Sequence, residues 1–140
     1  MKFEILFKDK KTAEELPKVD LRIKGILADA AFFLGTRGYP CLVTCLWRSS
    51  ERQAEIRKKA EKEGKKEPVK SPHEFWRAAD LSIQGIPDAV ISELVSYLNE
   101  KYPYDESGRY KTALRHDVGF GDHVHIQVSW QVPANFRWVA

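Results

Sequence analysis

The chain has 140 residues, of which 43% are hydrophobic and 31% are charged. This length and composition are typical of one globular domain and exclude a disordered or fibrous protein. The formal net charge is +3, and the whole excess lies in residues 51–70, which contain eight basic and five acidic residues. Because the rest of the chain is neutral, the composition argues against a protein built to bind nucleic acid.

Hydrophobic patterning divides the first half of the chain into alternating elements. It predicts a short strand over residues 3–7, followed by a charged segment over 8–18. Asp20 can cap a helix over residues 21–34, whose apolar residues recur at helical spacing. The β-branched and apolar run at 41–47 then predicts a strand.

Both cysteines, Cys41 and Cys45, lie in the run at 41–47. Four residues of strand span about 13 Å, whereas the Cα atoms of a disulfide lie within about 7 Å. In a regular strand both side chains point to the same face. We therefore expect two reduced core residues rather than a redox pair.

The second half of the chain continues the alternation. Ser49 or Ser50 can cap a helix over residues 51–63, which carries the basic excess on a solvated face. A strand is expected at 77–83, a helix from Pro87 onward, a loop at 102–108, and strands at 113–118 and 123–130. The order predicts an α+β fold in which helices flank a mostly antiparallel central sheet, as a single domain over residues 1–140.

Two short segments carry the residues that could do chemistry. His123 and His125 are two positions apart in an expected strand, so both can face one centre; such a pair also arises incidentally. His73 precedes Asp80 by seven positions, and Asp80 interrupts an apolar run, where a carboxylate is costly unless it is paired or bound to a metal. Alternatively, Asp80 faces water or pairs with Arg77. Two imidazoles and one carboxylate together form the protein ligands of a catalytic zinc site.

These segments resemble a known family. The motif Ser71-x-His73-x-x-x-x-Ala78-x-Asp80 resembles the SxHxxGxAxD motif of zinc D-alanyl-D-alanine carboxypeptidases and of phage L-alanyl-D-glutamate endolysins. Asp122-His123-Val124-His125 resembles the second motif of that family, and Arg48-Ser49-Ser50-Glu51-Arg52-Gln53 resembles its Arg-Ser-x-x-x-Gln segment. The His-x-His form is shared with the wider superfamily of lysostaphin-type peptidases and the hedgehog signalling domain. The three motifs occur in family order between residues 43 and 128.

The resemblance implies a role for each matching residue. It implies that Zn²⁺ is held by His73, Asp80 and His125. It gives Asp122 the role of general base, which accepts a proton from water and passes it to the leaving amine. For this, Asp122 must lie in the turn after Gly121 rather than in the strand.

The resemblance and the physical chemistry of the side chains suggest further roles. His123 is the alternative base, or a donor to the oxyanion or the substrate. Arg48 is expected to bind a carboxylate or carbonyl of the substrate, with a structural ion pair as the alternative. Ser71 is expected either to contact substrate near the metal or to shape the turn. Trp76 replaces the usual glycine of the motif, which brings the local turn and the pocket wall into question.

The sequence therefore predicts a zinc metallopeptidase that hydrolyses the peptide stems of bacterial peptidoglycan, as a carboxypeptidase or an endolysin-like endopeptidase. The alternative is a zinc-binding domain without hydrolysis, of the hedgehog type. We expect a monomer whose partner is a wall peptide, with no nucleic acid and no membrane insertion. The N-terminus has no apolar run typical of a signal peptide. We therefore expect synthesis in a cytoplasm and action at the cell wall, after release through a holin of a phage or prophage.

Overall fold

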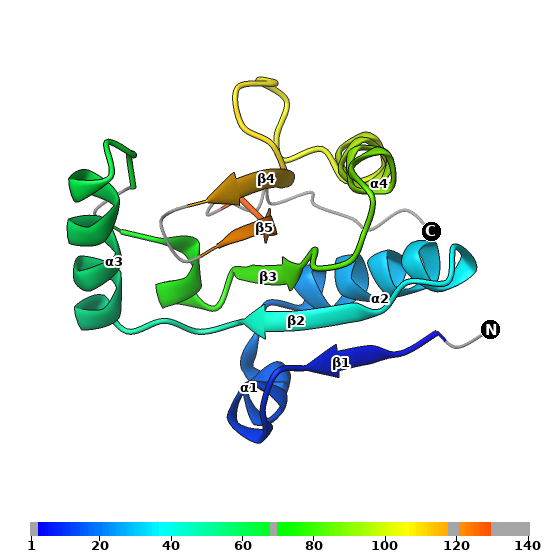
Figure 1. The fold of residues 1–140 in the computed structure, drawn as a ribbon, viewed down its shortest axis with the longest axis horizontal. Coiled ribbons are helices and arrows are strands. Elements are labelled where there is room, and N and C mark those ends of the chain that lie inside the picture. The colour runs from blue at the N-terminus through cyan, green and yellow to red at the C-terminus, as the bar shows by residue number, and fades with distance from the viewer. Residues whose placement is uncertain (1–2, 68–69, 118–120, 130–140) are drawn as a thin grey trace.

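The computed structural model describes residues 3–67, 70–117 and 121–129. The strands are β1 (Ile5–Phe7), β2 (Cys41–Cys45), β3 (Ala78–Ser82), β4 (Ala113–Asp117) and β5 (Asp122–Gln127). The helices are α1 (Lys10–Glu15), α2 (Leu21–Thr36), α3 (Ser50–Lys62) and α4 (Asp88–Lys101), and the 3-10 turns are η1 (Leu16–Lys18) and η2 (Pro72–Phe75). The sheet order is β1-β2-β3-β5-β4, with β1 and β2 parallel and the other pairs antiparallel (Figure 1). The α+β prediction with a mostly antiparallel sheet is confirmed.

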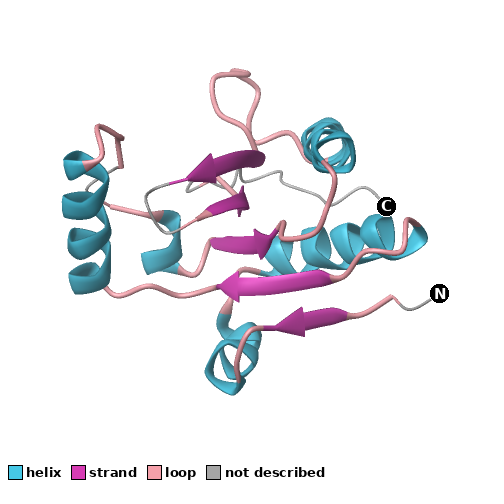
Figure 2. Cartoon of the chain, in the orientation of Figure 1, coloured by secondary structure: helices cyan, strands magenta, loops and turns pink. Residues whose placement is uncertain are grey.

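Helices α2 and α4 cover one face of the sheet. Asp20 caps α2 as expected, and its carboxylate accepts a hydrogen bond from the Arg22 backbone at 2.9 Å. The buried face of α2 carries Ile23, Ile26 and Leu27, each 0% exposed, at helical spacing. They pack with apolar strand residues and the inner face of α4 into one core. Figure 2 shows α2 running behind the strands. The core therefore lies on the helix-covered face.

The opposite face of the sheet carries polar residues that point away from α2 and α4. Asp80 in β3 is paired with His125 in β5, whereas the adjacent residues Leu81 and Val124 pair on the core side. Because side chains alternate along a strand, Asp80 and His125 share the polar face. Helix α3 lies beyond the C-terminal ends of β1 and β2 (Figure 1).

Helix α1 was not expected from the sequence, which showed only a charged segment at 8–18. The carboxylate of Asp9 accepts hydrogen bonds from the backbone N–H and the hydroxyl of Thr12, at 2.8 and 2.7 Å. A helix of six residues has too few apolar positions to show periodicity, so its cap is the main signal. The expected strand ends at Val118 and Trp130 lie outside the described residues. No helix in the described part of the chain is long and apolar enough to span a membrane.

A β-bulge at the end of β2 changes the direction of one cysteine. Val43 is paired with Leu81, and Cys45 is paired with Asp80, so two steps along β2 match one step along β3. This extra residue transfers Cys45 from the core face to the face of Asp80. The prediction of a core position is confirmed for Cys41, which is 1% exposed, and is wrong for Cys45, which is only partly buried.

Candidate metal centre

A 3-10 turn directs the imidazole of His73 toward the polar face of the sheet. Ser71 caps η2: its hydroxyl accepts a hydrogen bond from the His73 backbone at 3.2 Å, and the Glu74 carboxylate accepts one from the Ser71 backbone at 2.7 Å. Pro72 begins the turn, where its missing N–H costs nothing. The turn leaves His73 1% exposed. Ser71 is itself 2% exposed, which supports a turn-shaping role for it.

Three imidazoles converge on one carboxylate oxygen. The Oδ1 atom of Asp80 lies 3.1 Å from Nε2 of His73, 2.9 Å from Nδ1 of His125 and 3.5 Å from Nε2 of His123. Asp80 is 4% exposed, so this oxygen has little access to water. The structure thus brings the three expected metal ligands together, with His123 beside them.

The outer nitrogen of each imidazole faces a carbonyl oxygen. Nδ1 of His73 lies 3.1 Å from the backbone carbonyl of Leu46, and Nδ1 of His123 lies 3.1 Å from that of Gly121. A carbonyl oxygen can only accept a hydrogen bond, so each of these ring nitrogens must carry the hydrogen. The inner nitrogen of each neutral ring therefore presents a lone pair to Asp80.

His125 follows the same pattern through a side-chain amide. Its Nε2 atom lies 3.1 Å from Oε1 of Gln127, and the amide nitrogen of Gln127 donates to the carbonyl of Lys111 at 2.9 Å. The bond to Lys111 fixes the amide orientation, so Nε2 of His125 donates and Nδ1 has the lone pair. Outer N–H groups held by carbonyls are what metal-binding histidines use to orient their ligating nitrogens.

The electrostatics of this cluster favour a cation at its centre. Burial opposes ionisation of Asp80, yet His73 and His125 hold the pKa of its carboxyl well below the usual value. Burial alone would lower the pKa of His73, but the Asp80 carboxylate and the neighbouring Cys45 together outweigh it and raise that pKa to about 10. Burial lowers the pKa of His125, and its bond to Asp80 only partly offsets this. A proton on His73 satisfies one of the contacts to Asp80, whereas a divalent cation would satisfy all of them.

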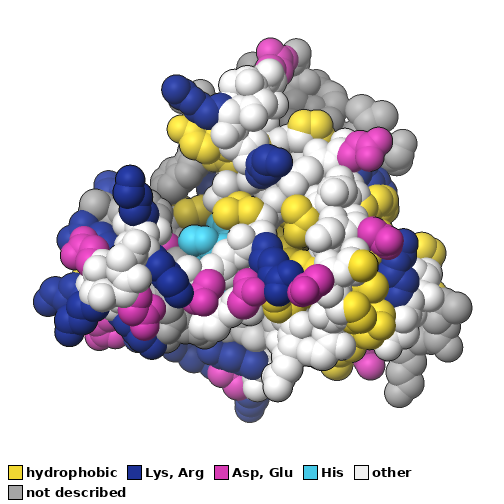
Figure 3. Space-filling model, turned by 45° about the horizontal axis from the view of Figure 1, so that its top comes forward, with side chains coloured by type: hydrophobic (Ala, Val, Ile, Leu, Met, Phe, Trp, Pro, Cys, Tyr) yellow, Lys and Arg dark blue, Asp and Glu magenta, His cyan; other side chains and the backbone are white. Residues whose placement is uncertain are grey.

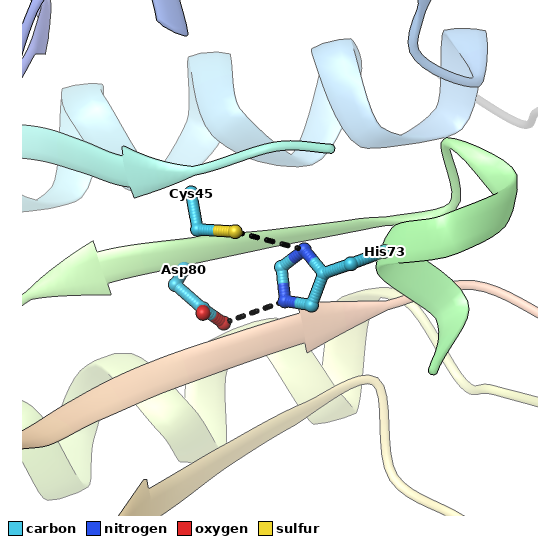
Figure 4. Close-up of side chains that lie close together, drawn as sticks. All are labelled: Cys45, His73 and Asp80. Carbon is cyan, nitrogen blue, oxygen red and sulfur yellow. Dashed lines mark hydrogen bonds and ion pairs between the residues drawn. The ribbon is translucent and has the colours of Figure 1, made fainter. Parts of the chain in front are cut away.

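The donor set fits zinc. Two neutral imidazoles and one carboxylate are a catalytic zinc set, which leaves a coordination position open. Among the described residues, two groups of three have donor atoms that all lie within 4.8 Å of one another: Asp80, His123 and His125, and Cys45, His73 and Asp80. The expected set of His73, Asp80 and His125 is not one of them, although both of its histidines contact Oδ1 of Asp80. In the second group, Sγ of Cys45 lies 3.6 Å from Nδ1 of His73 (Figure 4). Every candidate set includes Asp80, which makes this carboxylate the centre of the site.

Arg48 lies in a buried polar network next to Asp80. Its guanidinium donates to Oε1 of Gln53 at 2.7 Å and pairs with Oδ2 of Asp80 at 3.6 Å and with Glu67 at 3.8 Å. Glu67 also lies 3.3 Å from Nε2 of His116. These contacts favour the structural ion pair that was the alternative for Arg48. The contact between the Arg48 guanidinium and Oδ2 of Asp80 orients this carboxylate so that its other oxygen, Oδ1, faces the histidines.

Glu67 was not identified from the sequence. It belongs to the charged run at 51–70, which was expected to be solvated, yet its side chain is only 5% exposed. Burial opposes its ionisation, but hydrogen bonds from His116 and Gln53 and nearby positive charge lower the pKa of Glu67. Only the pairing with residues from three other parts of the chain distinguishes it, so no local pattern could have found it.

Asp122 does not lie in a turn that directs it toward the histidines. It is the first residue of β5, in register with Asp117, and its carboxylate accepts a hydrogen bond from Arg115 at 2.8 Å. Strand alternation places the Asp122 side chain on the face opposite His123 and His125. The expectation of an inward-directed turn is therefore corrected, because strand pairing begins one residue earlier than predicted.

Trp76 keeps the turn that glycine usually makes in the family motif. It has φ 62° and ψ 29°, the left-handed conformation that glycine adopts at least cost. Its ring stacks on Trp47 with centroids 5.6 Å apart and packs against the core. This packing offsets the backbone strain, so the substitution preserves the turn that carries His73.

A groove of about 600 Å³ opens beside the cluster, between the ends of β1 and β2, the first turn of α3 and the start of β5. Asp80, Asp122 and His123 line it, and Asp80 and His123 also line a smaller cavity of about 170 Å³ that contains Glu67 and His116. In the space-filling view a histidine side chain reaches the surface, with basic side chains nearby (Figure 3). Because Asp80 and His123 line the groove, the candidate metal centre opens onto it.

Comparison with known proteins adds no match: no family model, curated protein or solved structure matches the chain. The resemblance to zinc peptidases accordingly rests on the three motifs.

Proposed function

We propose that this protein is a zinc-dependent peptidase that hydrolyses the peptide stems of bacterial peptidoglycan. The observation that supports it is the convergence of imidazole lone pairs on Oδ1 of Asp80, with each outer N–H held by a carbonyl. His73, Asp80 and His125 would hold the ion. When bound, zinc polarises a peptide carbonyl and makes water a better nucleophile.

The remaining groups divide the other tasks. The lone pair of His123 at the groove side can accept a proton from water and return it to the leaving amine, because its other nitrogen is held by Gly121. Asp122 also lines the groove, but its carboxylate is bound to Arg115 and strand alternation directs it away from His125, so His123 replaces it in this proposal as the proton-transfer group. Arg48 orients Asp80. The groove leaves room for an extended peptide.

The direct test combines metal binding with cleavage of purified peptidoglycan. We expect one Zn²⁺ per chain, release of stem-peptide fragments by the zinc-loaded protein, and no release after chelation. Mass spectrometry of the fragments identifies the bond that is cut, and so separates a carboxypeptidase from an endopeptidase. An enzyme of this kind made in a cytoplasm reaches the wall after release through a holin.

One control variant and two alternative outcomes decide how the result is read. A Lys10→Ala variant, altered at an exposed position outside the groove, should cleave like the parent. Stoichiometric zinc binding without cleavage of any wall peptide would replace the peptidase by a zinc-binding domain of the hedgehog type. Cleavage that persists in the zinc-free protein would contradict the metal-dependent mechanism.

A further inference from the structure

The groove has a basic wall that the sequence motifs do not include. Lys8 directly follows β1, and Lys11 lies in the first turn of α1; both line the groove that also contains Asp80. The backbone N–H of Lys8 donates to the carbonyl of Val43 at 3.0 Å, which extends the pairing of β1 with β2. Because these strands are parallel, their C-terminal ends meet at one edge of the sheet (Figure 1). This edge forms the groove.

The two lysines differ from the other basic residues of the groove in their pairing. Arg48 pairs with Asp80 at 3.6 Å, and Arg52 pairs with a glutamate of its own helix at 2.9 Å. Among the described residues, Lys8 and Lys11 have no carboxylate oxygen within 4.0 Å of the ammonium nitrogen. Their charges are therefore available to a ligand in the groove.

The acidic residues of the same segment do not neutralise these lysines by direct contact. The Asp9 carboxylate is occupied by the backbone and hydroxyl of Thr12, as the cap of α1. Glu15 is partly buried; burial raises its pKa, the charges of Lys11 and Lys8 act against this, and neither lysine forms an ion pair with it. Both lysines remain exposed on the groove side of this segment.

We propose that Lys8 and Lys11 form an anion subsite, which selects peptides with a free carboxylate away from the bond that is cut. The inference rests on the proposed peptidase function. Two ammonium groups on one wall attract a carboxylate by charge and by hydrogen bonds, whereas an amide loses the charge. A C-terminal carboxylate and an acidic side chain share this chemistry, and differently amidated peptides distinguish them.

The experiment uses synthetic stem peptides in three forms: with all carboxylates free, with only the C-terminus amidated, and with only the acidic side chain amidated. Binding is measured by calorimetry to the metal-free protein, where no cleavage competes, and KM and kcat are measured with the zinc-loaded protein. The test variant is Lys8→Gln with Lys11→Gln. The control is Lys10→Gln, from the same segment, because Lys10 pairs with Glu14 and does not line the groove.

The double variant should bind the free-carboxylate peptide about fivefold to twentyfold more weakly, as expected for two partly exposed charge contacts. KM should rise by a similar factor with kcat unchanged. One of the amidated peptides should bind the parent more weakly by the same factor and be insensitive to the double variant. That peptide identifies the carboxylate that the lysines hold.

The two proposals fail in different ways. The anion subsite would be overturned if the parent protein bound all three peptides equally, or if Lys10→Gln lost as much affinity as the double variant. Cleavage by the zinc-loaded parent would still uphold the peptidase in that case. Binding that depends on both lysines, in a zinc-loaded protein that cleaves nothing, would overturn the peptidase and uphold the subsite.

Discussion

The two faces of the central sheet are built from the same strands but have opposite chemistry. Ala79 and Leu81 in β3 point into the apolar core under α2 and α4, while Asp80 between them points to the histidines. Val124 and His125 in β5 show the same division. The core face is held by apolar burial, and the polar face is held by a network of charges and hydrogen bonds. Side-chain alternation therefore allows the fold and the site to be altered separately.

The largest effect is expected at the centre of the polar face. Asp80→Asn removes the charge but keeps the shape, and zinc affinity should fall more than about a hundredfold because every candidate ligand set uses this carboxylate. Competition with a chromogenic chelator measures the affinity. Asp88→Asn, at the start of α4 on the other face, serves as the matched control and should bind zinc normally. Undiminished zinc binding by Asp80→Asn would place the metal elsewhere.

The next effect separates His123 from Asp122, which are neighbours in β5 on opposite faces. Removing a proton-transfer group costs about 10²- to 10⁴-fold, so His123→Ala should lower kcat by that factor while zinc remains bound. Asp122→Asn should change kcat by less than about threefold, because its carboxylate contacts Arg115. The opposite ranking would restore Asp122 as the general base.

On the core face, we expect a loss of stability without a loss of metal. Leu27 is 0% exposed, and Leu27→Ala should lower the free energy of unfolding by about 2–5 kcal/mol. Denaturant titration measures this change, and zinc stoichiometry should stay at one ion per chain. A parallel loss of zinc would show that the two faces are coupled.

The smallest effect uses the two cysteines of β2, one on each face. Cys45 lines the groove and should be alkylated in the native protein, whereas Cys41 should not react. Burial raises the pKa of the Cys41 thiol to about 12, so its reactive thiolate is scarce. Mass spectrometry should find one label per native chain, located at Cys45. Labelling of Cys41 at the same rate as Cys45 would contradict the placement of Cys45 on the groove face and of Cys41 in the core.

Local patterns predicted what depends on local chemistry. The spacing of apolar residues found α2, and the order of motifs found His73, Asp80 and His125, whose convergence the structure shows. Glu67 could not be found in this way, because its burial depends on contacts with residues distant in sequence. The facing of Cys45 depends on a bulge, and no feature of the run at 41–47 indicates where its extra residue lies.

The bulge also decides which side chain of β2 lies beside Asp80. With the same residues in regular pairing, Thr44 would lie opposite Asp80 and Cys45 would turn into the core. Deleting Thr44 would restore regular pairing but leave Cys45 opposite Asp80, because Cys45 would then directly follow Val43. The extra residue therefore decides whether a sulfur or a hydroxyl lies next to this carboxylate.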